Sequence, residues 1–321
     1  MPYLGRIRHL VIRDPRLIIP FLESPPHLMK FLHTLEIWDH GHEKNVWKVT
    51  SLGNAPNLRD IHLFGDPRPL LKSLIYFPLS QITNISLLYV PLRDYDILGI
   101  LHLAPNLISG SFAIGNPNTV SILTEINDLI FPLIHNIHFL SLDHPQVETS
   151  LAGLQPDRLI LSAVRNVSVR AWRWRPLLSP IILYSGALEK LDIQTASISV
   201  DDLRELLLGA PRLTFLSITR PRKPSVMLPI QIIDKIAEGA LVPRLETLRC
   251  YIDSRHPAAP QMLSLHLDML ELRRLDTTKA SHIANVTFCF LEDREWVQRF
   301  MLVGLLQRVK KMNQEGWKIE I

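Results

Sequence analysis

Residues 200–218 read "VDDLRELLLGAPRLTFLSI" and contain one complete unit of a repeated pattern. Leucines in the first half recur at helical spacing, so they would share one face of a helix whose first turn Asp201 or Asp202 caps. Ala210-Pro211 then ends the helix, because proline lacks a backbone N–H and disfavours the helical conformation in the preceding residue. The phrase at 213–218 places its last two apolar residues on one face of a strand. The stretch therefore predicts a helix, a turn and a strand.

The strand phrase, apolar-x-x-apolar-x-apolar, recurs along the whole chain. Most successive copies lie 24–27 residues apart, with three longer steps of 30, 32 and 38 residues. This spacing falls in the range of about 20–29 residues that is typical of leucine-rich repeats. The pattern predicts an α/β leucine-rich repeat solenoid, a horseshoe of about eleven irregular repeats. The phrases begin at residues 7, 32, 58, 82, 107, 134, 164, 188, 213, 245 and 283.

A short proline-bearing mark precedes four of the phrases. It reads "APNL" at 55–58 and 104–107, "APRL" at 210–213 and "VPRL" at 242–245. We interpret it as the turn between an outer helix and the next inner strand, with the small first residue lying under the turn. The mark is structural and carries no chemistry.

A single repeat cannot bury its apolar face, whereas stacked repeats can, so we expect one elongated domain. The repeats would occupy residues 1–291, and the longer steps would hold inserted loops, among them 220–229 and 254–261. Residues 292–321 would form a C-terminal capping helix and a final strand. Trp296, Phe300, Val303 and Leu306 lie at helical spacing within this cap.

Composition limits the function classes. The 35 basic and 31 acidic residues leave a formal charge of +4, which is too small a surplus to indicate nucleic-acid binding. No stretch reaches the ~18 apolar residues of a membrane span, and the N-terminus lacks the apolar run of a signal peptide. Two cysteines are too few for a secreted disulfide scaffold. These features predict a cytoplasmic or nuclear protein that binds neither nucleic acid nor membrane.

Catalytic motifs are absent from the sequence. It contains no phosphate-binding loop, dinucleotide fingerprint, nucleophile elbow or Cys-x-x-Cys pair. Cys250 occupies a core position of its phrase, whereas Cys289 should face outward and be the more reactive thiol. We therefore expect no enzyme activity, no catalytic residues, no cofactor and no metal. A site hidden in the loops at 220–229 or 254–261 is the remaining enzymatic alternative.

Two clusters leave alternatives open. Asp39-His40-Gly41-His42-Glu43 could bind zinc through its two histidines, or it could be a polar turn at the rim of the solenoid. Trp172-Arg173-Trp174-Arg175 could be a recognition patch, because Trp and Arg are favoured at interface hot spots, or it could alternate between core and surface.

The outward-facing strand positions predict a binding surface. Repeat solenoids bind partners on the concave face, which the strands line. In each phrase, the residues two, four and six positions after the first should point outward. Adjacent repeats place Trp38, Phe64 and Leu88 at the sixth position, and strands lie ~4.8 Å apart, so the three would form one apolar strip. A charged rim would surround this strip and complete a protein-binding site, formed by Arg13, Glu36, Asp60 and His62.

Three segments resemble the leucine-rich region of fungal, mushroom-type F-box proteins. They are "ISVDDLRELLLGAPRLTFLSI" at 198–218, "LGILHLAPNL" at 98–107 and "LLQRVKKMNQEGWKIEI" at 305–321. The resemblance covers nearly the whole chain. It implies that the repeats hold a substrate while an upstream F-box docks on the adaptor of an SCF ubiquitin ligase. This sequence begins almost directly on its first repeat and contains no F-box, so the adaptor is an expected partner only if an F-box lies upstream.

The sequence thus predicts a non-enzymatic protein-recognition module. By resemblance, it would be the substrate-binding part of an F-box-type ubiquitin-ligase subunit. The alternative is a stand-alone repeat scaffold for protein–protein interaction, with no link to ubiquitin.

Overall fold

The computed structural model forms two compact units, Met1–Val164 (unit 1) and Arg165–Ile321 (unit 2). The boundary expected from the sequence between residues 291 and 292 stays a prediction. The structure describes residues 6–13, 29–39, 55–65, 74, 77–92, 94–114, 129–130, 133–141, 159–160, 162–171, 186–195, 198–219, 228–252, 257–275, 280–290 and 303–320.

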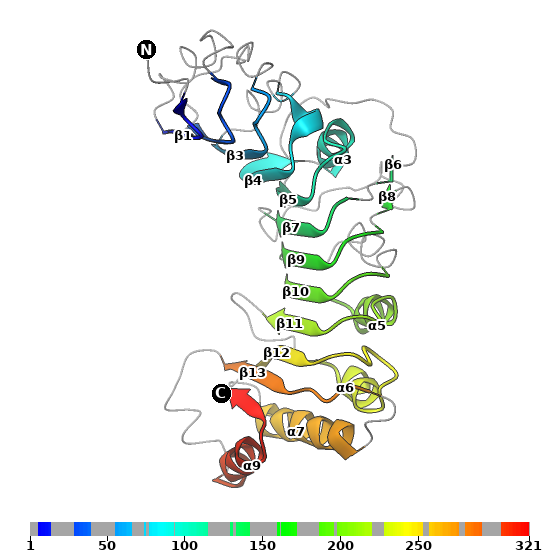
Figure 1. Ribbon diagram of the computed structural model, residues 1–321. Coiled ribbons are helices and arrows are strands. Elements are labelled where there is room, and N and C mark those ends of the chain that lie inside the picture. Colours follow the sequence, from blue (N-terminus) through cyan, green and yellow to red (C-terminus); the bar gives the residue numbers. More distant parts are fainter. Residues whose placement is uncertain are drawn as a thin grey trace. The chain divides into compact units, whose positions relative to one another are not determined.

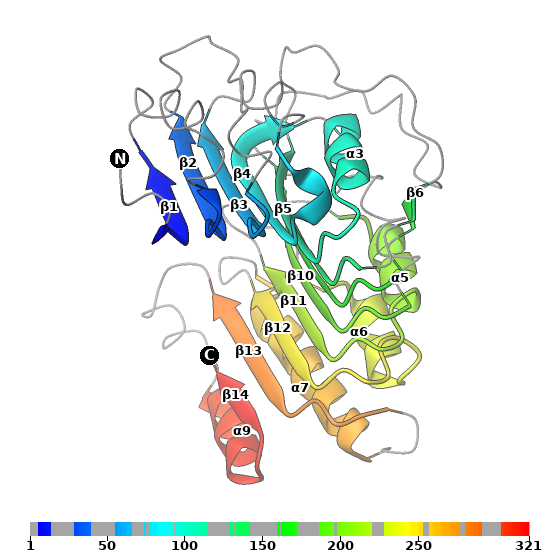
Figure 2. The ribbon, with the colours of Figure 1, turned by 45° about the horizontal axis from the view of Figure 1, so that its top comes forward.

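Unit 1 is built on parallel strands that pair in chain order. Each strand hydrogen-bonds to the next, and helix α3, which connects β4 to β5 in the chain, lies to one side of the strands (Figure 2). Two short strands form a separate parallel pair. The strands are β1 (His9–Ile12), β2 (Thr34–Asp39), β3 (Asp60–Gly65), β4 (Asn84–Leu92), β5 (Ser109–Ile114) and β7 (Asn136–Ser141). The described residues of the unit also contain the 3-10 helix η4 (Leu79–Gln81), α3 (Asp94–Leu103) and the pair β6 (Leu129–Ile130) and β8 (Leu159–Ile160).

Unit 2 repeats this plan with more helix. Its strands are again parallel, and α5, α6 and α7 lie on the same side of them (Figure 1). The strands are β9 (Asn166–Ala171), β10 (Lys190–Thr195), β11 (Phe215–Thr219), β12 (Thr247–Ile252), β13 (Asn285–Phe290) and β14 (Lys318–Glu320). The helices are α5 (Val200–Leu208), α6 (Ile230–Ala237), α7 (Ala259–Leu275) and α9 (Val303–Gln314).

Each of the eleven phrases produces one strand, which starts two residues after the phrase begins. The apolar positions form the core. In the phrase that contains β3, for example, Leu58, Ile61 and Leu63 are fully buried. Both units are therefore stacks of leucine-rich repeats, and the fold class predicted from the sequence is confirmed.

A regular set of backbone hydrogen bonds joins each repeat to the next. The carbonyl of His33 accepts from the amides of Arg59 and Asp60, at 2.9 and 3.1 Å, and the carbonyl of Arg59 accepts from Thr83 and Asn84. The same bonds recur in unit 2, where the carbonyl of one repeat again accepts two amides of the following one. These bonds give the backbone amides and carbonyls just before the strands a hydrogen-bond partner, as a packed fold requires.

The "APNL" mark is a tight turn that also binds the preceding repeat. The amide of Leu58 donates to the carbonyl of Ala55, and the amide of Leu107 to that of Ala104. Both alanines are buried, as expected, and Ala104 directly follows α3. The asparagines add a role that the sequence did not indicate. Asn57 donates to the carbonyl of Lys30 and Asn106 to that of Ser80, so each side chain stitches its turn to the repeat before it.

Helix α5 confirms the expected apolar face, since Leu203, Leu206 and Leu207 are all buried. The expected cap is wrong. Ser199 is the capping residue, and its hydroxyl oxygen accepts from the amide of Asp202 at 3.0 Å. The hydroxyl in turn donates to the Asp202 carboxylate at 2.6 Å. Serine one residue before the helix satisfies a free amide that Asp202, already inside the first turn, cannot.

The long step before β13 contains a helix in addition to a loop. Residues 259–261 were expected within a loop, but they begin α7, whose 17 residues lie within the 38-residue step. Within the expected loop at 220–229, residues 220–227 lie outside the described part of the chain. Of the loop at 254–261, residues 254–256 lie outside it as well.

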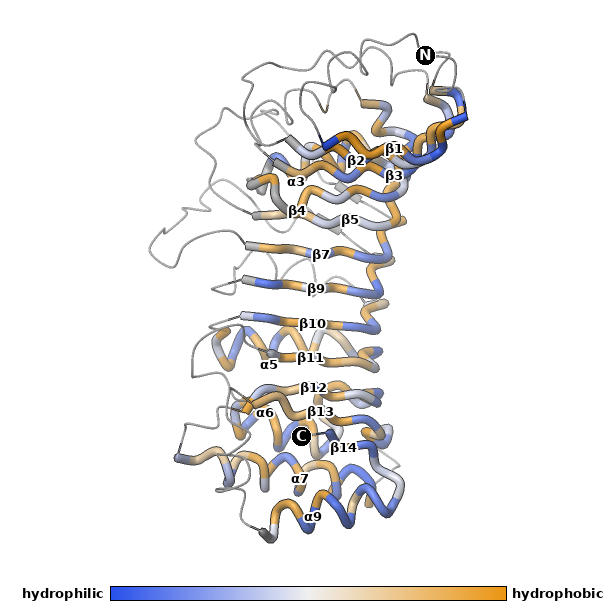
Figure 3. Tube along the Cα trace, turned by 90° about the vertical axis from the view of Figure 1, so that its left-hand side faces the viewer, coloured by the Kyte–Doolittle hydropathy of each residue, from blue (hydrophilic) through white to orange (hydrophobic). Residues whose placement is uncertain are grey.

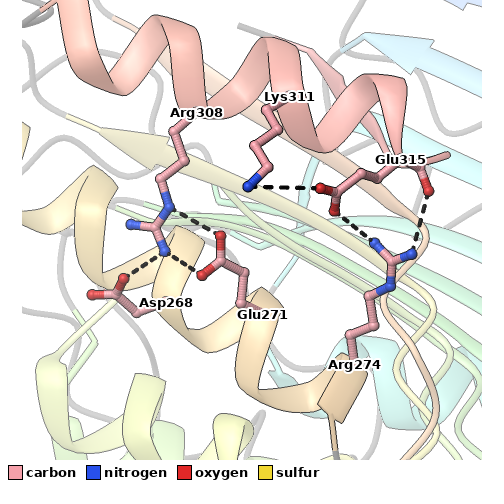
Figure 4. A network of polar contacts seen from close by, with 6 residues as sticks. All are labelled: Asp268, Glu271, Arg274, Arg308, Lys311 and Glu315. Atoms are coloured by element: carbon pink, nitrogen blue, oxygen red, sulfur yellow. Dashed lines mark hydrogen bonds and ion pairs between the residues drawn. The ribbon is translucent and has the colours of Figure 1, made fainter.

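The C-terminal segment packs on α7 through α9 and on β13 through β14. Helix α9 buries Val309 and Met312, and its hydrophilic and hydrophobic residues alternate along the tube in Figure 3, as expected of an amphipathic helix. Charged contacts bind α9 to α7 as well. Arg308 reaches Asp268 at 2.6 Å and Glu271 at 2.7 Å (Figure 4). Trp296 and Phe300, expected in the same helix, lie outside the described residues.

Candidate protein-binding site

An aromatic pair stands at the centre of the predicted site. Trp38 of β2 and Phe64 of β3 are aligned by the strand register, and their rings stack with centroids 4.1 Å apart and planes 15° apart. Both side chains are half-buried. A stacked pair contributes about 0.5–1.5 kcal/mol beyond its buried area and holds both rings in one orientation. The pair therefore presents a rigid, partly exposed apolar surface.

Two charged side chains flank the pair. Arg13, which follows β1 and is exposed, places its guanidinium carbon 5.8 Å from the centre of the Trp38 ring. On β2 itself, the indole N–H of Trp38 donates to the carboxylate of Glu36. The indole is thus held by a cation over its ring, an acceptor at its nitrogen and the neighbouring Phe64. We call the set Arg13, Glu36, Trp38 and Phe64 the aromatic surface.

Leu88 is not aligned with this pair. The register between β3 and β4 runs only from Asp60 opposite Asn84 to His62 opposite Ser86. Beyond that point β4 is irregular, with a bulge between Leu87 and Pro91 where it pairs with β5. Leu88 falls in this bulge and is half-buried. Counting along the phrase assumes a regular strand, so the sequence could not reveal this break.

The Asp60 carboxylate is largely engaged by side chains of the neighbouring repeats. Its carboxylate accepts from the hydroxyl of Thr34 at 3.1 Å and from the amide nitrogen of Asn84, and it lies 3.3 Å from Nδ1 of His33. These donors come from both neighbouring repeats. Asp60 thus links three strands, and fewer of its lone pairs remain for a partner. His62, also half-buried, lies opposite Glu36 in the register.

The other candidate clusters lie largely outside the described residues. Asp39 ends β2, but 40–43 and the whole of 172–175 fall outside. Across the described ranges, no group of three or more His, Cys, Asp or Glu side chains is placed to hold a metal ion. In the same ranges, no helix is both long and apolar enough to cross a membrane.

The two cysteines occupy opposite faces of neighbouring strands, as the sequence predicts. Cys250 of β12 is buried, and burial raises the pKa of its thiol far above the usual range. Cys289 of β13 is half-buried, and its sulfur accepts from Nε of Arg249 at 3.4 Å. This contact is also the main reason why the pKa of Arg249 is raised. Sequence spacing gives no sign of the pairing, because Arg249 and Cys289 are 40 residues apart.

Comparisons with known proteins add little. No family model matches the sequence, and no curated protein does. Among solved structures, the crystal structure of a TLR13–ssRNA13 complex is similar, with a TM-score of 0.33 and 11% sequence identity over 88% of this chain. The chain spans 50% of the length of that protein. A likeness at this level says nothing about binding or activity.

Proposed function

We propose that this chain is a non-enzymatic protein-recognition module that holds a partner protein on the aromatic surface of unit 1. The fold supports this, because stacked repeats present an extended row of strands as a binding surface. The aromatic surface lies on these strands, on the side opposite the buried core.

The observation that carries the proposal is the stacked Trp38–Phe64 pair, half-buried between Arg13 and Glu36. Interface hot spots are enriched in Trp, Tyr and Arg and are surrounded by polar groups that exclude water. The two rings are held in place before binding. Packing a partner on them would therefore cost little further side-chain entropy at this site. In this site Glu36, Arg13 and His62 would form the polar rim, while Leu88 and Asp60 would contribute less than the sequence suggests.

In its narrower form, the proposal makes this chain the substrate-binding part of an F-box-type ubiquitin-ligase subunit in the cytoplasm or nucleus. The resemblance of 198–218, 98–107 and 305–321 to fungal F-box proteins supports this form. Docking on the SCF adaptor would then depend on an F-box joined upstream of these repeats.

Affinity capture of the tagged chain from extract of its source cells tests both levels. The wild type is compared with the double variant Trp38→Ala, Phe64→Ala and with Phe215→Ala, and bound proteins are identified by mass spectrometry. Phe215 is the matched control, because it is a half-buried aromatic at an outward position of β11 in unit 2. The partner should be lost from the double variant and kept by the control.

Two outcomes would contradict the proposal. Retention of every bound protein by the double variant would show that the aromatic surface is not the contact. A loss of more than about 2 kcal/mol in its unfolding free energy would show that the rings serve the core. Capture of the SCF adaptor and cullin by both forms supports the ligase assignment, and their absence leaves the stand-alone scaffold.

A further inference from the structure

Unit 1 carries a row of cations where its first three strands begin. Arg6 and Arg8 precede β1, Lys30 precedes β2, and Arg59 precedes β3. We call these four residues the basic edge. They are four of the five Lys and Arg residues that the structure describes in unit 1, the fifth being Arg13. No Asp or Glu lies in the described turns that lead into these strands, 6–8, 29–33 and 55–59.

The charges of the basic edge face solvent. Arg6, Arg8 and Lys30 are exposed, and Arg59 is half-buried. Among the described residues, none of the four forms an ion pair. Lys30 lies 5.7 Å from the centre of the Phe31 ring, which is itself 48% exposed. Arg59 donates through Nη1 to the carbonyls of Pro56 and Leu58, so its guanidinium is anchored on its own turn.

Backbone hydrogen bonds place two of these cations, Arg8 and Arg59, on either side of His33 in adjacent repeats. The carbonyl of Arg8 accepts from the amide of His33, and the carbonyl of His33 accepts from that of Arg59. The three residues therefore sit side by side on adjacent strands, and Arg8 and Arg59 are about 10 Å apart at two strand spacings. About three residues of an extended chain span this distance.

The basic edge and the aromatic surface lie at opposite ends of the same strands. His33, directly before β2, and Trp38 near its end are five residues apart along the chain. At about 3.3 Å per residue, the separation is roughly 16 Å. One extended segment of a partner can therefore reach both places.

We propose that the basic edge binds an acidic polypeptide segment of the same partner that packs on the aromatic surface. This inference rests on the proposed function. The partner's contact segment would carry an aromatic or large apolar residue and, about five extended residues away, a run of Asp or Glu. Complementary exposed charges of this kind act mainly through association rate and specificity, and salt weakens them.

The geometry favours an acidic peptide over nucleic acid. Single-stranded nucleic acid requires a groove of cations that follows many phosphates, together with aromatic faces on which successive bases stack. The basic edge spans only three strands. Among the described residues that lead into these strands, the aromatic side chain is Phe31, which already has the ammonium of Lys30 near its ring.

Fluorescence anisotropy with labelled synthetic peptides tests the proposal. The first peptide carries one tryptophan, a spacer of about five Gly and Ser residues and about six glutamates, and the second has glutamine at each glutamate position. The full chain is compared with the edge variant Arg8→Glu, Lys30→Glu. The matched control is Arg212→Glu, Arg244→Glu, which reverses two exposed arginines at the turns before β11 and β12 and changes net charge equally.

We expect the glutamate peptide to bind the wild type at least about tenfold more tightly than the glutamine peptide at low salt. The edge variant should lose this preference and the control should keep it. Equal loss in both variants would overturn the proposal, since only net charge would then matter. So would the absence of any preference up to about 1 mM peptide, or tighter binding of an oligothymidylate of equal charge.

Failure of the proposed function gives a different pattern. Binding of the glutamine peptide depends on the tryptophan alone, so its insensitivity to Trp38→Ala, Phe64→Ala counts against the aromatic surface. The preference for glutamate over glutamine reports on the basic edge in either case.

Discussion

The two units use their cations differently. In unit 2, Arg273 is buried and donates to backbone carbonyls, Arg308 joins α9 to α7, and Arg274 pairs with Glu315 at 3.0 Å. In unit 1, the described cations lie on the surface, and none of those at the basic edge forms an ion pair with a described residue. Unit 2 thus uses part of its positive charge inside the fold, at Arg273, whereas the described cations of unit 1 lie at the surface.

The strand faces differ in the same sense. Unit 1 presents the stacked Trp38–Phe64 pair, whereas the described outward positions of β10, β11 and β12 in unit 2 are mostly polar or charged around Phe215. The central outward positions on β10, β11 and β12 are Asp192, Ser217 and Arg249, which the register places in one row. Exposed aromatic area with unengaged charge nearby marks a binding surface better than a row of mutually compensating polar groups. The comparison therefore supports the proposal that the binding surface lies on unit 1.

The largest effect should come from Arg273. Its guanidinium donates to the carbonyls of Ile236, Val242, Pro243 and Ser281, which tie α6 and the turn before β12 to α7. Val242 has φ 40, a strained backbone conformation for a β-branched residue, and Arg273 binds its carbonyl. Arg273→Met should remove all of these charge-assisted hydrogen bonds, including the donors to the Ser281 carbonyl, and lower the unfolding free energy by about 3–5 kcal/mol.

Urea unfolding measures this loss, with Arg274→Met as the control. Arg274 is the next residue on α7 but is exposed, so its loss should cost less than about 1 kcal/mol. Equal losses of unfolding free energy in the two variants would contradict this account, because the buried Arg273 would then stabilise the fold no more than the exposed Arg274 does.

A second test concerns pH. His266 is fully buried in α7, donates through Nδ1 to the Met262 carbonyl at 2.7 Å, and meets the edge of Phe288. Burial lowers its pKa from 6.5 to about 4, so the folded state favours the neutral ring. Its contribution to stability is constant above pH 6.5 and falls by roughly 1.4 kcal/mol per unit as pH drops toward 4.

The expected loss attributable to His266 is roughly 3 kcal/mol between pH 6.5 and 4. Urea unfolding over this range should show a steeper decline for the wild type than for His266→Met, which does not titrate. Parallel curves would mean that this ring charges as easily in the folded state as in the unfolded state.

Gly110 of β5 allows a test of core packing in unit 1. This residue takes an apolar position of the β5 phrase, and a Cβ there would lie 2.5 Å from Phe112, whose ring fills the space. Gly110→Ala should lower the unfolding free energy by about 1–3 kcal/mol because the buried ring must shift. Gly186→Ala is the control, since nothing lies within 4 Å of its Cβ. Thermal unfolding that shifts equally in both variants would contradict the packing described here.

The smallest effect is expected at the contact between α7 and α9. Arg308→Gln removes the pairs with Asp268 and Glu271, all of which are partly exposed, so we expect a loss of about 0.5–1 kcal/mol. Hydrogen exchange of the α9 amides should speed up in the variant and, for the wild type, in high salt. Lys235→Gln, which breaks the exposed pair with Glu238, should leave α9 unchanged.

The repeat could be predicted from the sequence because each phrase contains its own strand. Local apolar spacing places Ile61 and Leu63 on one face, and proline marks the end of the preceding helix. Contacts between repeats could not be predicted. The donors to Asp60 lie 24 and 26 residues away, and the β4 bulge that displaces Leu88 leaves no local signal.

The burial of charged residues in helices could not be predicted from the sequence. "ELRRL" at 271–275 suggests a solvent-facing stretch, yet Arg273 is 1% exposed while Arg274 beside it is on the surface. Which of two adjacent arginines is buried depends on the carbonyls that α6 and its following turn offer, and these are 30–37 residues away. The same limit applies to α7 itself, whose start was expected to be a loop.

The most direct test of the central claim is the affinity of the captured partner for three forms of the full chain, measured by titration calorimetry. Trp38→Ala, Phe64→Ala in unit 1 should weaken binding by at least about tenfold, since each hot-spot residue contributes more than about 1 kcal/mol. Phe215→Ala in unit 2 should bind as the wild type does. Weakened binding by Phe215→Ala alone, with the double variant unaffected, would place recognition in unit 2 and contradict the account.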